Sequence, residues 1–112
     1  MKLNLNKLSV EMYGIAKMRE ENGAKISTEI MPMLKHCATE VVEATEALVK
    51  MENTPCDNSE IDKLYHDFEL ELGDIICCAL IIAGREEIDI TKVLCEVVEK
   101  NKKRAMKTGD KL

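Results

Sequence analysis

The chain has 112 residues, which suffices for one domain with a hydrophobic core, although association between copies would help to stabilise so small a domain. Its net charge of −5 argues against binding to nucleic acid polymers or anionic membranes. Two tyrosines, one phenylalanine and no tryptophan argue against stacking platforms for single-stranded bases. The five cysteines form no Cys-x-x-Cys pair, and an odd number without a signal peptide predicts a reducing, cytoplasmic location.

Helical spacing of apolar residues predicts the first two helices. The first covers residues 3–22 and ends at Asn22-Gly23, where glycine suits the left-handed conformation that closes many helices. The second covers residues 30–52, with Ser27 or Thr28 as its expected N-cap.

The third predicted helix begins with a capping box at Ser59 and Asp62 and ends at Gly84. Its second half, residues 70–83, is apolar except at Glu71, Gly73 and Asp74. This pattern predicts that the second half of the helix is buried on every side. This stretch is too short to span a bilayer.

A fourth helix is predicted over residues 90–104, with Asp89 as its N-cap. No segment has the alternation of a strand. We therefore expect an all-α fold: a single domain over residues 1–112, built like a four-helix bundle on an antiparallel hairpin of the second and third helices, with a flexible tail at 105–112.

Two carboxylate pairs are the candidate functional residues of this hairpin. Glu40 and Glu43 share one face of the second helix, and Glu71 and Asp74 share one face of the third. If the hairpin brings the pairs together, the four charges need cations, and an all-oxygen set suits Mg²⁺, Mn²⁺ or Ca²⁺. A di-iron site is the rival, but it requires Glu-x-x-His, which the sequence lacks.

The fourth helix is basic towards its end. Asn101 and Arg104 continue the face on which Leu94 and Val97 lie, and lysines surround them. Acidic and basic groups that converge in this way fit hydrolysis of a phosphoanhydride.

These motifs together resemble those of the MazG-like, all-α nucleotide pyrophosphohydrolases. The resemblance rests on Glu40-x-x-Glu43, Glu71-Leu72-Gly73-Asp74, Asn101-x-x-Arg104 and the ending Gly109-x-Lys111, and it covers roughly residues 5–112. Thr39 and Thr108 depart from the family pattern, since an acidic residue and a histidine are common at these positions.

The resemblance implies hydrolysis of a nucleoside triphosphate to the monophosphate and pyrophosphate, with Mg²⁺ as cofactor and Mn²⁺ as a substitute. It further implies metal binding by Glu40, Glu43, Glu71 and Asp74, and assembly into homodimers or homotetramers. The residues that it implies for the nucleotide or its phosphates are Asn101, Lys103, Arg104 and Lys111. Two alternatives stay open: a phosphoribosyl-ATP pyrophosphohydrolase, and a helical interaction module that has lost its chemistry.

Overall fold

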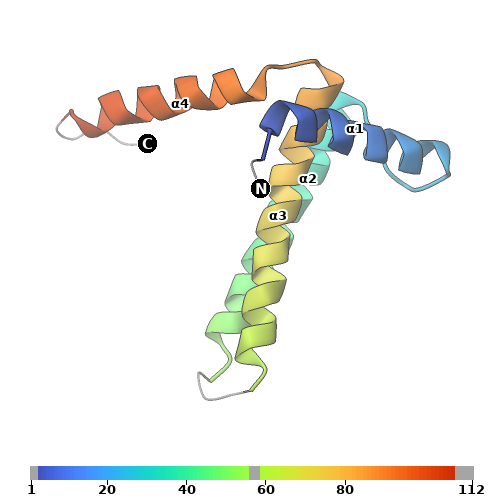
Figure 1. Ribbon diagram of the computed structural model, residues 1–112. Coiled ribbons are helices and arrows are strands. Elements are labelled where there is room, and N and C mark those ends of the chain that lie inside the picture. Colours follow the sequence, from blue (N-terminus) through green and yellow to red (C-terminus); the bar gives the residue numbers. More distant parts are fainter. Residues whose placement is uncertain (1–2, 56–58, 108–112) are drawn as a thin grey trace.

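The computed structural model describes residues 3–55 and 59–107, and four helices make up most of them (Figure 1). The helices are α1 (Leu5–Glu21), α2 (Ile30–Glu52), α3 (Ile61–Arg85) and α4 (Ile90–Ala105). The part of the chain that is described contains no strand, so the all-α prediction is confirmed.

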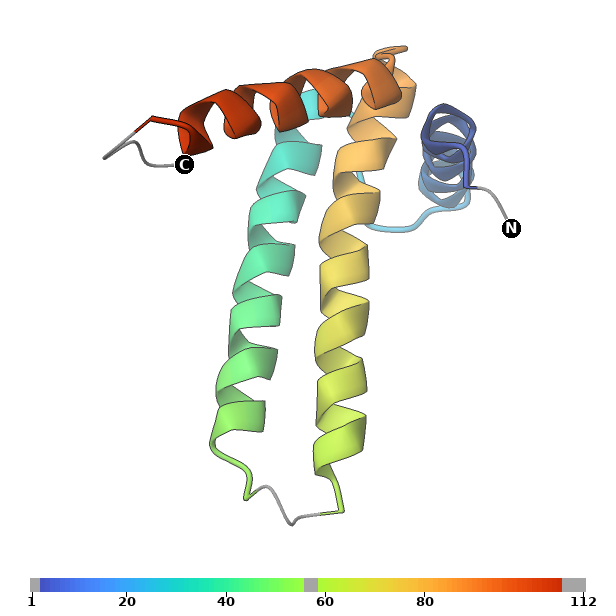
Figure 2. The same ribbon diagram turned by 60° about the vertical axis from the view of Figure 1, so that its left-hand side comes forward.

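Helices α2 and α3 form a long antiparallel hairpin, and the other two helices meet it at one end (Figures 1 and 2). Helix α1 packs across the second half of α3. Helix α4 leaves the same end at a steep angle, and its main contact, a small one, is with α1 rather than with α2 or α3. The hairpin is therefore open to solvent along much of its length.

The hydrophobic core lies where α1 crosses the hairpin. It is centred on Ala16 of α1, Met33 of α2, and Cys78 and Ile81 of α3, all of them buried. Because no residue of α4 is buried, the core depends on three helices only.

Helices α1 and α4 each begin at a residue whose side chain caps the helix. Asn4 accepts a hydrogen bond from the backbone N–H of Lys7, and Asp89 accepts one from the N–H of Lys92. The predicted cap at Asp89 is thus confirmed.

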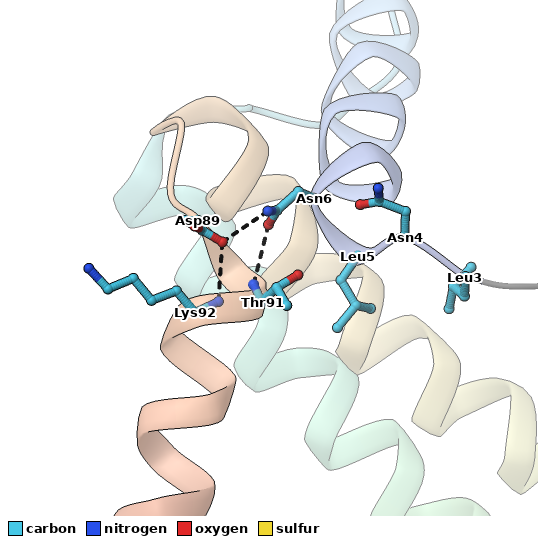
Figure 3. Close-up of a pocket in the computed structure, with 7 residues that line it drawn as sticks. All are labelled: Leu3, Asn4, Leu5, Asn6, Asp89, Thr91 and Lys92. Carbon is cyan, nitrogen blue, oxygen red and sulfur yellow. Dashed lines mark hydrogen bonds between the residues drawn. The ribbon is translucent and has the colours of Figure 1, made fainter.

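The side chain of Asn6 joins the start of α1 to the start of α4 (Figure 3). Its amide nitrogen donates to Asp89 Oδ1 at 2.9 Å, and its amide oxygen accepts from the backbone N–H of Thr91 at 3.2 Å. These two bonds fix the first turn of α4, and we call this arrangement the Asn6 clasp.

The expected caps of the hairpin helices were wrong. Thr28 donates both its backbone N–H and its hydroxyl to the carboxylate of Glu20, at 3.0 and 3.1 Å, so its side chain is engaged away from α2. The N-cap of α2 is Glu29 and that of α3 is Glu60, and neither makes a side-chain cap bond.

Gly84 does not end α3, contrary to the sequence-based expectation. The helix continues to Arg85, and the turn that closes it uses Glu87 at a positive φ of 55°. Gly84 instead lies where α1 and α3 cross, and a Cβ there would overlap the backbone carbonyl of Ser9. The glycine is required by close packing rather than by the helix end.

Candidate metal-binding site

Three carboxylates from both arms of the hairpin converge on one point. Each of Glu40 and Glu43 on α2 and Glu71 on α3 places an oxygen within 4.8 Å of the others. We call these three residues the acid cluster. The hairpin brings them together because each lies on the side of its helix that faces the other helix.

Burial makes this arrangement costly for the protein alone. Glu40 is only 8% exposed, and Glu71 is half-buried. Burial, followed by the charges of Glu43 and Asp74, raises the pKa of both Glu40 and Glu71 above its ordinary value. The Oε2 atoms of Glu40 and Glu71 are buried and have no hydrogen-bond donor among the described residues. Oxygens left in this way fit ligation of a divalent cation, for which carboxylates are the preferred donors.

Asp74 lies beside the acid cluster without being a full member of it. Its carboxylate is exposed, but it is close enough to raise the pKa of Glu40 and Glu71. Of the four acidic residues chosen from the sequence, three therefore meet closely and the fourth lies at the edge.

His36 is a neighbour of the acid cluster that sequence reasoning missed. Its Nε2 lies 3.1 Å from Oε1 of Glu40, one helical turn further along α2. The spacing of four residues between a histidine and a glutamate was the available signal. His36 engages Oε1 of Glu40, and Oε2 is the buried oxygen that has no donor among the described residues.

An open cavity of about 400 Å³ extends from the acid cluster towards the tip of the hairpin. Glu71 and Asp74 form one end of it, and we call it the tip cavity. Its other lining residues are Ala47, Lys50, Leu64, Asp67 and Leu70. Lys50 and Asp67 were also missed from the sequence, although they continue the helix faces that carry Glu43 and Glu71.

The basic residues predicted for substrate binding do not join this site within one chain. Asn101, Lys103 and Arg104 lie on α4, which has no extensive contact with either arm of the hairpin. Asn101 and Arg104 are half-buried and Lys103 is exposed. Lys111, Gly109 and Thr108 lie outside the described residues.

Comparison with protein families gives a match to the MazG nucleotide pyrophosphohydrolase domain over residues 26–108. The chain belongs to this family. The match begins just before α2 and includes the whole acid cluster, the tip cavity and α4, while α1 lies outside it. Comparisons with curated proteins and with solved structures returned no match.

Membership in the family agrees with the resemblance seen in the sequence motifs. It indicates an enzyme of the nucleotide pyrophosphohydrolase class, and it is consistent with the divalent-metal chemistry that the acid cluster suits. No helix in the part of the chain described here is both long and apolar enough to cross a membrane.

Proposed function

We propose that this protein is a Mg²⁺-dependent nucleoside triphosphate pyrophosphohydrolase, with Mn²⁺ able to replace Mg²⁺. The observation that carries the proposal is the acid cluster, whose buried and unpartnered oxygens come from the family-matched hairpin. The role inferred for the enzyme is removal of unwanted nucleotides from the cellular pool.

The reaction would break the bond between the α and β phosphates. Water adds to the α phosphorus and gives up a proton, and pyrophosphate leaves with the electron pair of the broken bond between the α phosphorus and the bridging oxygen, giving the nucleoside monophosphate. A divalent cation bound at this site would neutralise phosphate charge and make a bound water more acidic. Glu40, Glu43, Glu71 and Asp74 would hold it.

The protein's own residues would prepare this site before the substrate arrives. His36 would hold the carboxylate of Glu40 in one orientation and leave its unpartnered Oε2 available to a cation. The buried position of Glu40 limits access of bulk water from behind the site. The open side, lined by Glu71 and Asp74, would admit the polyphosphate.

A panel of nucleoside and deoxynucleoside triphosphates with Mg²⁺ tests the proposal through release of pyrophosphate. Phosphoribosyl-ATP belongs in the panel, because its exclusive turnover would favour the alternative enzyme. Glu71→Gln should abolish turnover in a folded protein, whereas Glu46→Gln, an exposed change on α2 outside the acid cluster, should leave it intact. A folded wild-type protein that binds Mg²⁺ but hydrolyses no nucleotide would contradict the proposal.

We also propose that the active form is a homodimer or homotetramer. Large apolar side chains are exposed along the hairpin, among them Val42, Leu70 and Ile76, each more than half exposed. Helix α4 adds an uncovered stripe formed by Val93, Leu94, Val97 and Val98. A second copy is the natural cover for such surfaces, because burying them removes apolar area from water.

Assembly would also explain how α4 takes part. Since α4 stands away from its own hairpin, Asn101 and Arg104 could meet an acid cluster only in another copy. Mixing inactive Glu71→Gln with inactive Arg104→Ala should then restore turnover, because some sites would combine intact acidic and basic groups. If the subunits exchange and the mixture still shows no turnover, the acidic and basic groups of one site must come from the same copy.

A further inference from the structure

The tip cavity extends from the acid cluster towards the tip of the hairpin. Towards the other end of the hairpin, the space between α2 and α3 is filled by the core residues Met33 and Cys78, with Cys37 packed against them. Towards the tip, Glu71 and Asp74 open into the tip cavity. A substrate held at the acid cluster therefore has open space along the hairpin towards its tip, whereas the core fills the space in the opposite direction.

Lys50 gives the tip cavity one group that can bind a phosphate. Lys50 is the one cationic side chain that lines it, and no aromatic side chain is present among its described lining residues to stack a base. In the described part of the chain, the Lys50 ammonium has neither an ion pair nor a hydrogen-bond partner. A free ammonium beside carboxylates is available for an anionic ligand.

Helix geometry directs Lys50 back towards the acid cluster. Side chains on a helix tend to lean towards its N-terminus, and for Lys50 this is the direction of Glu43. Glu43 precedes Lys50 by two turns, roughly 10 Å at the rise of an α-helix. The long lysine side chain covers a large part of this distance, and a polyphosphate chain can cover the rest.

We propose that Lys50 binds the β or γ phosphate of the substrate, so that the triphosphate tail lies in the tip cavity of the same chain. The inference rests on the proposed function and adds the direction in which the substrate lies. Asp67 opposes Lys50 in this role, because its carboxylate lines the same cavity and repels phosphate. The two residues should therefore affect binding of the tail with opposite signs.

Product inhibition of the Mg²⁺-loaded enzyme tests the direction in which the substrate lies. Lys50→Met should raise the inhibition constant of pyrophosphate by roughly tenfold, the effect expected for loss of one hydrogen bond between charged groups. The inhibition constant of the nucleoside monophosphate should stay unchanged. Asp67→Asn should lower the constant for pyrophosphate, and Lys50→Arg should keep it near the wild-type value.

Lys25→Met is the matched control, because Lys25 is an exposed lysine of the segment before α2, outside the tip cavity. An equal effect of Lys25→Met would overturn the inference, since it would reflect net charge alone. The inference would also be overturned if the inhibition constant of the monophosphate changed and that of pyrophosphate did not. The nucleoside end of the substrate would then lie in the tip cavity. A loss of stability in Lys50→Met without any change in either inhibition constant would overturn the inference as well. Lys50 lies in the last turn of α2, and its charge would then only stabilise the C-terminal end of that helix.

Calorimetry separates this inference from the proposed function. Pyrophosphate is titrated with Mg²⁺ into wild type, Lys50→Met and Lys25→Met, without any turnover being needed. If the wild type hydrolyses no triphosphate, the proposed function fails, and the affinity of Lys50→Met for pyrophosphate still decides the role of Lys50. Weaker binding by Lys50→Met alone supports the contact, and equal binding by all three proteins contradicts it.

Discussion

His36 and Glu40 are joined at 3.1 Å between the imidazole Nε2 and carboxylate Oε1, and this contact engages one of the two oxygens of Glu40. Oε2 is the buried oxygen that has no donor among the described residues. When Glu40 is ionised, Nε2–H donates to Oε1 and orients the whole carboxylate.

The first prediction is that His36→Ala weakens Mg²⁺ binding by roughly 10- to 100-fold, the usual effect of removing a group that orients a ligand. His36→Gln should restore part of the affinity, because its amide can still donate to the carboxylate. Titration of Mg²⁺ followed by calorimetry measures both variants, with His66→Ala as the control, since His66 is exposed and pairs with Glu69 instead. Unchanged affinity in His36→Ala would show that Glu40 is oriented without it.

The second prediction concerns the acid cluster in metal-free protein. Glu40→Gln should raise the thermal midpoint in the presence of a chelator, because it removes one of several close, partly buried like charges. The same variant should lose most of the stabilisation that Mg²⁺ gives the wild type by binding the folded state. Melting curves with and without Mg²⁺ provide the comparison, and Glu46→Gln should behave as wild type. A lower midpoint without metal would show that the Glu40 charge stabilises the fold.

The third prediction is a pH dependence whose sign follows from the raised pKa values of Glu40 and Glu71. Because the folded state holds these protons more tightly than the unfolded state, their contribution to stability is complete below the ordinary pKa of 4.5. It is lost as the pH rises from 4.5 through the raised values. The metal-free wild type should therefore lose stability relative to Glu40→Gln over this interval.

Glu20 has a lowered pKa, so its contribution to stability changes with pH in the opposite sense to that of Glu40. This contribution must cancel when the two proteins are compared. Hydrogen bonds from Thr28, followed by Lys17, lower the pKa of Glu20, so its contribution is present above 4.5 and is lost as the pH falls. Both proteins contain Glu20, and the difference between their denaturation midpoints isolates Glu40. A difference that does not vary with pH would contradict the raised pKa.

The sequence was sufficient to predict four helices and the meeting of Glu40, Glu43 and Glu71. Both follow from local periodicity and from the geometry of a hairpin. The position of α4 could not be predicted in the same way, because an apolar stripe such as that of Val97 indicates burial without identifying the partner. Lys50 and Asp67 were missed because exposed charged residues on helices are common, and only the fold places these two in one cavity.

Gly84 shows a second limit of reading from sequence. A glycine near the end of a helical pattern usually closes the helix, which was the expectation here. The close approach of the Ser9 carbonyl is a contact between residues far apart in the chain, and no local signal encodes it.

The fourth prediction is that Gly84→Ala destabilises the protein by about 1–3 kcal/mol, the usual cost of adding a group to a tightly packed contact. The methyl group would overlap the backbone of Ser9, which cannot move without shifting α1. Gly14→Ala is the matched control, because Gly14 is also helical and its Cβ would meet nothing within 4 Å. That change should stabilise α1 by up to about 1 kcal/mol. Urea denaturation measures both, and equal effects would contradict the packing argument.

The fifth prediction concerns the Asn6 clasp, which links α1 to the first turn of α4 (Figure 3). Asn6→Ala removes the donor to Asp89 and the acceptor for the backbone N–H of Thr91. Asp89 still caps α4 through the N–H of Lys92, so the helix should form but should be held less firmly against α1. Amide exchange should accelerate in α4 and remain unchanged in α2 and α3, which pack mainly against each other and against α1. Asn4→Ala is the control, because it removes the cap of α1 and leaves the clasp intact. If α4 supplies Asn101 and Arg104 to another copy, Asn6→Ala should also raise the KM for triphosphate. Faster amide exchange in every helix would contradict the prediction, because it would indicate general unfolding.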